Sequence, residues 1–206
     1  MITLYGITAS RAFRPLWLME ELGLAYRQVE LDYRGKALEA ADYLALNPNG
    51  RIPTLVDGDL VLWESMAINL YLARRYGQQA GFWPDSVAGE GQAYQWSFWV
   101  MSEIEHALLT VLMHGRVLPV EDRDADKVSR NRGVLQRPFG VLDKALAGRE
   151  YLVDDHFGVA DLNVAAVLVW CKPGRVSLEE FPNLDAWLSR CLARPARKRA
   201  QAAHAG

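Results

Sequence analysis

The chain has 206 residues and half of them are apolar, so it can bury a core in one large domain or in two small ones. Its formal net charge is −2 and no acidic or basic block runs along it, which argues against nucleic-acid binding as its main role. No apolar run reaches transmembrane length, and the first residues show a strand pattern, not a signal peptide. We therefore expect a cytoplasmic protein without a membrane segment.

The first elements predict a β-α-β unit. Residues 2–5 read as a short strand, and residues 26–31 read as a second one. Between them, Pro15 is tolerated only in the first turn of a helix, so the helix should begin within residues 11–14 and end near Gly23. This places Ser10 at or just before the amino-terminal end of that helix.

The next stretch predicts a hairpin followed by a helix. After a short helix over residues 40–46, residues 54–56 and 60–63 are β-prone runs separated by the turn signal Asp57-Gly58. Glu64-Ser65 then opens a helix, with Ser65 expected to cap the turn that begins at Met66. The order β-α-β then β-β-α is typical of a thioredoxin-like domain, a mixed sheet covered by helices on both faces.

Pro53 stands at the start of the hairpin, where its missing N–H confines it to an edge, a bulge or the first strand position. Such a proline leaves the backbone of Ile52 able to pair with an extended ligand, and the Ile52-Pro53 bond can be cis. The helix start at Ser65 offers free N–H groups to a carboxylate. Together these features suggest a peptide-like anionic ligand, and a loop proline beside an ordinary helix cap is the alternative.

The second half of the chain predicts helices only. We expect a first domain over residues 1–77, a Gly- and Pro-rich linker over 78–90, and an all-helical domain over 91–206. The basic cluster that begins at Arg194 is typical of a solvated helix end. The expected helices cover residues 92–114, 122–146 with Pro138 inside it, 158–170 with Asp161 in a capping box, and 181–192.

The cysteines and histidines predict neither a disulfide nor a metal site. Cys171 and Cys191 lie far from a Cys-x-x-Cys spacing and suit the thiols of a reducing compartment. Glu103 and His106 have the Glu-x-x-His spacing of di-iron bundles, but such a site needs carboxylates from partner helices as well. We expect no metal.

Motifs spread along the whole chain resemble those of the soluble glutathione transferases. The segment 47–53, NPNGRIP, is similar to that family's turn and proline, and 64–68, ESMAI, to its ligand-binding helix start. The segment 157–161, FGVAD, is similar to the capping segment of its buried helix. The early segment 10–14, SRAFR, resembles the Ser-x-x-x-Arg start of the theta-like and related bacterial branches.

The resemblance implies a thioredoxin-like glutathione site joined to an all-helical domain, usually in a homodimer, with the acceptor pocket between the domains. Pro53 would be the cis-proline, and the backbone of Ile52 would pair with the cysteinyl part of glutathione. Glu64 and Ser65 would hold the γ-glutamyl end, and Ser10 would face the sulfur.

The chain departs from the family pattern at two positions. Gly158 replaces the usual Ser or Thr, which removes a side-chain cap at a cost of a few tenths of a kcal/mol, roughly, since glycine is a tolerable N-cap. Leu38 stands where many relatives carry a basic residue for the glycyl carboxylate. That role would pass to Arg51 or Asn49.

The thiol chemistry can be weighed from elementary magnitudes. Lowering the glutathione thiol pKa by about two units from about 8.5 needs roughly 2.7 kcal/mol of preference for the thiolate. A hydroxyl hydrogen bond to an anion supplies about 1.5–3 kcal/mol, and a helix start adds up to about 2. Ser10 could provide both, with Tyr5 and Thr8 as competing hydroxyls and a plain helix cap as the structural alternative.

Other roles for Ser10 lack their partner residues. A hydrolase nucleophile needs a base, and the first histidine of the chain is His106, in the other domain. Dithiol exchange needs a cysteine where Ser10 or Phe13 stands.

We therefore expect a detoxifying transferase that conjugates glutathione, its co-substrate, to small hydrophobic electrophiles. Phe13, Trp99 and His106 are the expected acceptor-pocket residues. The alternatives are a non-catalytic protein of this fold that binds a ligand or a partner, and a glutathione-dependent peroxidase, isomerase or dehalogenase.

Overall fold

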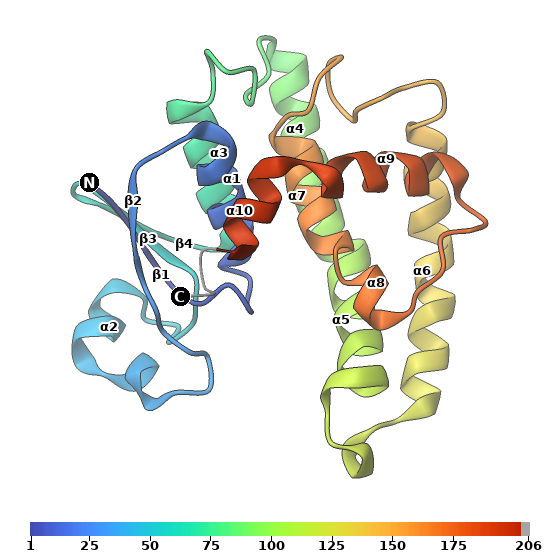
Figure 1. Ribbon diagram of the computed structural model, residues 1–206, viewed down its shortest axis with the longest axis horizontal. Helices are drawn as coiled ribbons and strands as arrows, with labels where there is room; N and C mark the ends of the chain where they lie inside the picture. The colour runs from blue at the N-terminus through green and yellow to red at the C-terminus, as the bar shows by residue number, and fades with distance from the viewer. Residues whose placement is uncertain (203–206) are drawn as a thin grey trace. The chain divides into compact units, whose positions relative to one another are not determined.

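The computed structural model describes residues 1–202 and contains two compact units. Within the described residues, the first unit comprises Met1–Trp83 together with residues 194–202, and the second comprises Pro84–Ala193. The expected architecture of a thioredoxin-like domain and a helical domain is confirmed (Figure 1). Within residues 1–202, no helix has the length and apolar character that crossing a membrane requires.

A four-stranded mixed sheet in the order β2-β1-β3-β4 is the centre of the first unit. β1 runs parallel to β2 and antiparallel to β3, which pairs antiparallel with β4. The elements of this unit are β1 (Ile2–Tyr5), α1 (Phe13–Leu22), β2 (Tyr26–Val29), the 3₁₀ helix η1 (Lys36–Glu39), α2 (Ala41–Leu46), β3 (Thr54–Asp57), β4 (Leu60–Trp63), α3 (Ser65–Tyr76) and α10 (Pro195–Ala202).

Successive side chains of β1 and β3 point alternately to the two faces of the sheet. Leu4 and its cross-strand partner Leu55 are fully buried, while the neighbouring pair Tyr5 and Thr54 points to the opposite face. There Tyr43 of α2 packs its ring against Tyr5 and hydrogen-bonds Thr54 Oγ1 at 2.9 Å. α1 and α3 pack together at the other face (Figure 1).

Local signals set the ends of α1 and β2. α1 has Pro15 in its first turn and ends at Gly23, which adopts the left-handed conformation with φ 62°. β2 stops at Val29, two residues before the expected end, because β1 ends at Tyr5 and offers no further partner. The last contact of this pair is the bond from Gly6 N–H to the Val29 carbonyl, 2.9 Å.

The expected cap at the start of α3 is wrong. Glu64, not Ser65, is the N-cap residue, and its side chain makes no capping hydrogen bond. Glu64 adopts φ 72° and ψ 112°, so the helix can begin only at the next residue, while the Glu64 carbonyl accepts from Ile68 N–H at 2.9 Å. Ser65 is consequently the first helical residue, and its hydroxyl has another partner.

The second unit is entirely helical. Its elements are α4 (Val87–Val100), the π-helical segment η2 (Met101–Glu105), α5 (His106–Leu112), a second π-helical segment η3 (Met113–Val117), the 3₁₀ helix η4 (Val120–Asp122), α6 (Ala125–Ala145), α7 (Val159–Leu168), α8 (Cys171–Gly174) and α9 (Pro182–Ala193). α4 begins inside the expected linker, because the Ser86 hydroxyl accepts from Gly89 N–H at 3.0 Å and caps it.

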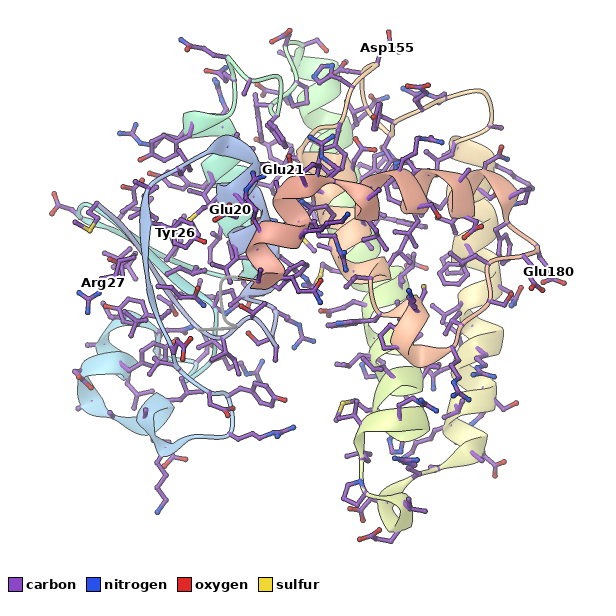
Figure 2. All side chains as sticks on the ribbon, viewed as in Figure 1. Glu20, Glu21, Tyr26, Arg27, Asp155 and Glu180 are labelled. Atoms are coloured by element: carbon purple, nitrogen blue, oxygen red, sulfur yellow. The ribbon has the colours of Figure 1, made fainter. Side chains whose placement is uncertain are left out.

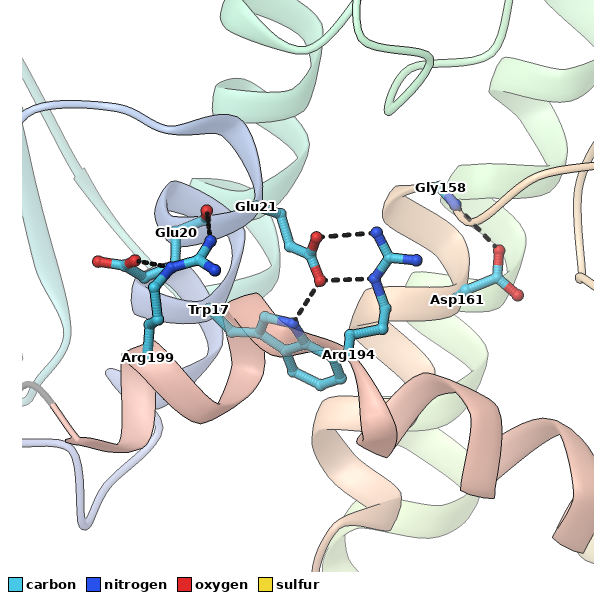
Figure 3. A network of polar contacts seen from close by, with 7 residues as sticks. All are labelled: Trp17, Glu20, Glu21, Gly158, Asp161, Arg194 and Arg199. Atoms are coloured by element: carbon cyan, nitrogen blue, oxygen red, sulfur yellow. Dashed lines mark hydrogen bonds and ion pairs between the residues drawn. The ribbon is translucent and has the colours of Figure 1, made fainter.

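α7 is buried along its whole length, as its apolar sequence predicts. Its Asp161 carboxylate accepts from Leu152 N–H at 2.9 Å and from Trp187 Nε1 at 2.8 Å. It also accepts from Gly158 N–H at 3.2 Å (Figure 3). Burial raises the pKa of Asp161 to about 6, against the lowering effect of these donors. The carboxylate therefore joins the helix start to a preceding loop and to α9.

The carboxy-terminal segment, expected in the helical domain as a solvated end, forms α10 against α1 of the first unit. The Arg194 guanidinium binds the Glu21 carboxylate through Nε at 2.6 Å and Nη2 at 2.9 Å (Figure 3). Arg199 binds the neighbouring Glu20, whose carboxylate also accepts from Tyr26 Oη at 2.9 Å. Figure 2 labels Glu20, Glu21 and Tyr26 within this unit.

Candidate functional site

Ser10 lies in the turn between β1 and α1, three residues before α1 begins. Its Oγ donates to the Ile7 carbonyl at 2.6 Å and accepts from Ala12 N–H at 3.1 Å. A serine hydroxyl has one proton, so this proton is held by Ile7 here. Contact between Ser10 and a thiolate requires the hydroxyl to rotate away from that carbonyl.

Gly6 brings this turn next to Ile52. It has φ 136°, and a Cβ added to it would lie 2.8 Å from Ala12 Cβ and 3.2 Å from Ile52 Cβ. Only glycine combines this conformation with such close approach. The turn that carries Ser10 and the loop that carries Ile52 are therefore neighbours.

The loop before β3 is held by two side chains from the α2 region. Tyr43 Oη and Asn47 Nδ2 both donate to the Arg51 carbonyl, at 2.6 and 2.7 Å. The Ile52-Pro53 peptide bond is cis, the geometry that the resemblance implies. Within residues 1–202 nothing hydrogen-bonds the backbone amide or carbonyl of Ile52, and β3 begins two residues later. An extended backbone can pair with these groups.

The start of α3 carries a buried positive charge. Ser65 is buried, and its Oγ accepts from Arg14 Nη1 at 3.1 Å. Arg14 is only 1 % exposed, so its guanidinium adds to the positive end of the α3 dipole in a region shielded from water. The preceding Glu64 is exposed and adopts a backbone conformation that non-glycine residues rarely populate, as is common at functional sites.

Sequence reasoning did not include Arg14 among the site residues. The available signal was its place one helical turn after Ser10 in the SRAFR segment, beside a proline that fixes the helix start. The roles of Gly6 and Tyr43 were missed as well, since both depend on contacts between segments distant in sequence.

The competing hydroxyls have different surroundings. Thr8 Oγ1 is buried and has no hydrogen-bond partner among residues 1–202, and it belongs to the same turn as Ser10. Tyr5 packs its ring against Tyr43, with 5.9 Å between centroids. Thr8 is therefore the closer structural rival of Ser10.

The residues considered as ligands of the glycyl carboxylate differ in whether their side chains are exposed and free to bind it. Leu38 is buried, and its carbonyl lies 3.3 Å from the position of a Cβ on Gly50, so it serves as packing for this loop. The Asn49 amide is exposed but donates to Asn47 Oδ1 at 3.0 Å. Arg51 is exposed and positively charged, which makes it the better candidate.

The three acceptor-pocket residues belong to different units. Phe13 packs near Trp17 in the first unit, with 6.0 Å between ring centroids. Trp99 packs edge-on against Trp96 in α4, and His106 is exposed at the start of α5. The π-helical segment η2 lies between them and changes the helical register, so their seven-residue spacing does not by itself place them on one face.

Neither the thiols nor the metal-binding residue types form a centre in the described part of the chain. Cys171 and Cys191 are buried and not joined in a disulfide, and burial raises the pKa of Cys171 to about 12. Among residues 1–202, no three His, Cys, Asp or Glu side chains gather in a way that could hold a metal ion.

Comparison with known proteins agrees with this architecture. Residues 1–74 match the family described as glutathione S-transferase, N-terminal domain, and residues 100–195 match its C-terminal domain. Glutathione S-transferase GstB of Escherichia coli is 35 % identical over 199 residues, which cover 95 % of each chain.

Two solved structures are similar over nearly the whole chain. The theta-class glutathione S-transferase of Xanthomonas axonopodis pv. citri, with glutathione bound, is 32 % identical with a TM-score of 0.87, covering 97 % of this chain and 96 % of that one. The nitrogen regulation fragment of the yeast prion protein Ure2p is 28 % identical with a TM-score of 0.84, covering 97 % and 95 %.

Proposed function

Since the chain belongs to the glutathione S-transferase family, we propose that Ser10 stabilises the glutathione thiolate for attack on small hydrophobic electrophiles. The observation that carries this proposal is the convergence of three segments in the first unit. Gly6 places the Ser10 turn against Ile52, and the Arg14–Ser65 hydrogen bond joins the starts of α1 and α3.

Each part of the tripeptide has a complementary group in this arrangement. The cysteinyl amide and carbonyl pair with the unpaired backbone of Ile52, before the cis Pro53. The γ-glutamyl carboxylate binds at the start of α3, near Ser65, where the helix dipole and the buried guanidinium of Arg14 favour an anion. Glu64 accepts from the γ-glutamyl ammonium, and Arg51 binds the glycyl carboxylate.

Thiolate stabilisation requires Ser10 to exchange one acceptor for another. Its present bond to the Ile7 carbonyl is between neutral groups and is worth about 0.5–1.5 kcal/mol, whereas a bond to a thiolate is worth about 1.5–3. The exchange is favourable by about 1 kcal/mol, and the adjacent start of α1 adds to it. The hydroxyl keeps its proton and lowers the thiol pKa, so no general base is needed.

The thiolate then forms a carbon–sulfur bond with the electrophile: an aryl halide loses halide with the bonding electrons, whereas an isothiocyanate is attacked at its central carbon and its nitrogen takes up a proton from water. The half-buried ring of Phe13, three residues after Ser10, offers apolar surface for such a substrate. Trp99 and His106 are the proposed contribution of the helical unit. We further propose a cytoplasmic homodimer that acts in detoxification, on the basis of the family.

A second candidate function is non-catalytic binding. The bond from the Ser10 hydroxyl to Ile7 and the similarity to the nitrogen regulation fragment of Ure2p favour it. Peroxide reduction, isomerisation and dehalogenation with glutathione remain further activities for the same site.

Steady-state conjugation of glutathione to an aryl halide and to an isothiocyanate tests the proposal, with wild type, Ser10→Ala and Thr8→Val compared. We expect Ser10→Ala to lower kcat/KM by about fivefold, since it loses about 1 kcal/mol of net thiolate stabilisation, and Thr8→Val to stay close to wild type. An unchanged rate in Ser10→Ala removes Ser10 from the mechanism. No conjugation by wild type, with saturable glutathione binding, supports the non-catalytic function.

A further inference from the structure

A cationic cavity lies within the helical unit, where η3, the start of α6 and the end of α8 meet. Its volume is about 420 Å³. Four of the residues that line it are arginines, one is a histidine and none is acidic. The lining residues are His114, Gly115, Arg116, Arg123, Ala125, Val128, Arg132, Gly174 and Arg175.

Two of the arginines are held in place by backbone carbonyls. Arg123 donates from Nε to the Leu118 carbonyl at 2.8 Å and from Nη2 to the Arg116 carbonyl at 3.0 Å. Arg132 donates from Nη2 to the Arg175 carbonyl at 3.2 Å. Carbonyls orient a guanidinium without cancelling its charge, and each guanidinium keeps further N–H groups for a ligand.

The charges of these arginines are not neutralised by ion pairs. In the part of the chain from 1 to 202, none of the four forms a salt bridge with a carboxylate. The nearby Asp124 is engaged at the start of α6, where it accepts from Lys127 N–H at 2.8 Å. That bond is the main reason why the pKa of Asp124 lies below its usual value, with the charge of His114 as a smaller contribution.

Two further features add binding capacity to the cavity. His114 Nδ1 is buried and has no hydrogen-bond partner among residues 1–202. His114 belongs to the π-helical segment η3, a type of irregularity that is frequent at functional sites. Ala125, the first residue of the 21-residue helix α6, also lines the cavity, so the positive end of that helix dipole faces it.

We propose that this cavity binds a small phosphate-bearing molecule. The guanidinium fork matches phosphate oxygens in pairs, and four arginines, two of them held in place, favour a multiply charged phosphate over a single carboxylate. The volume lies within the range of about 300–1,000 Å³ that is typical of small-molecule sites and exceeds the size of one inorganic phosphate. All lining residues belong to the helical unit, so none of them is among the glutathione-binding residues proposed in the first unit.

Calorimetric titration of the full chain with pyrophosphate, at constant ionic strength, tests this site. We expect saturable binding, and a Kd raised by about tenfold or more in Arg116→Gln/Arg132→Gln, because each charge-assisted hydrogen bond is worth about 1.5–3 kcal/mol. The matched control is Arg130→Gln/Arg137→Gln, which removes the same charge from α6 at two positions that are exposed, as the cavity arginines are, but do not line the cavity. Its Kd should change by less than about twofold, because a screened charge that makes no contact with the ligand contributes little.

A folding control and an anion series complete the test. If the double variant is unstable, the single variant Arg116→Gln replaces it in the titration. This variant should fold normally, since the Arg116 side chain forms no hydrogen bond within residues 1–202. Sulfate and succinate should compete weakly with pyrophosphate. A phosphorylated sugar should compete better than inorganic phosphate, because it fills more of the cavity. Absence of saturable binding, equal weakening in the control variant, or equal competition by sulfate would overturn the proposal.

Discussion

Arg14 Nη1 donates to Ser65 Oγ across 3.1 Å, and both side chains are almost fully buried. This bond joins the start of α1, which follows Ser10, to the start of α3, which follows Glu64. The buried guanidinium therefore lies next to the positive end of the α3 dipole.

The Arg14–Ser65 pair should couple stability and glutathione affinity. Arg14→Gln removes the charge and leaves the Ser65 hydroxyl without this donor, so we expect a loss of about 2–4 kcal/mol in the free energy of unfolding and weaker glutathione binding. Urea unfolding and calorimetry of Arg14→Gln, Ser65→Ala and the double variant measure both effects. The coupling is absent if the two single changes are strictly additive.

Gly6 should tolerate no side chain. In Gly6→Ala the new Cβ meets Ala12 Cβ at 2.8 Å in a backbone conformation with φ 136°, so the Ser10 turn must move away from Ile52. We expect a loss of stability of about 1–3 kcal/mol and a raised KM for glutathione. Gly58→Ala is the matched control, because Gly58 also has positive φ but a Cβ there meets nothing within 4 Å. Equal effects of the two changes on KM would contradict this role of Gly6.

The pH dependence of thiolate formation should identify the donor. The ultraviolet absorbance of bound thiolate, titrated against pH, gives the pKa of enzyme-bound glutathione. In Ser10→Ala this pKa should rise towards the free-thiol value of about 8.5, while Thr8→Val should keep the wild-type value. If the Thr8 variant alone shifts the pKa, Thr8 takes the place of Ser10 as donor, as its unpartnered hydroxyl would allow.

Asp161 should make stability depend on pH in a defined direction. Because burial raises its pKa from 3.8 to about 6, the folded chain holds this proton more tightly than the unfolded chain. The stability contributed is full below pH of about 4 and is lost as pH rises through about 6, by roughly 3 kcal/mol. The difference in unfolding free energy between wild type and Asp161→Asn should therefore be larger at low pH than at pH 7. A difference that grows with rising pH would show a lowered pKa instead.

Helices and turns whose limits are set by residues close by in the sequence could be predicted. Pro15 fixed the start of α1, Asp57-Gly58 the hairpin, and the apolar run after Asp161 the buried helix α7. The placement of the Ser10 turn against Ile52 rests on Gly6, whose close contacts have no local signature.

Contacts between distant residues could not be predicted. Arg194 and Arg199 read as a solvated cluster because their partners, Glu21 and Glu20, lie 173 and 179 residues away in the chain. The cap of α4 by Ser86 was hidden in a segment rich in glycine, and the π-helical segments carry no composition signal.

The most direct test is calorimetric titration with glutathione and with S-methylglutathione at pH 7, in two buffers that differ in ionisation enthalpy. If the first unit grips the tripeptide and ionises its sulfur, both ligands bind saturably and only glutathione releases protons on binding. Absence of saturable glutathione binding, or equal proton release with both ligands, would contradict the account.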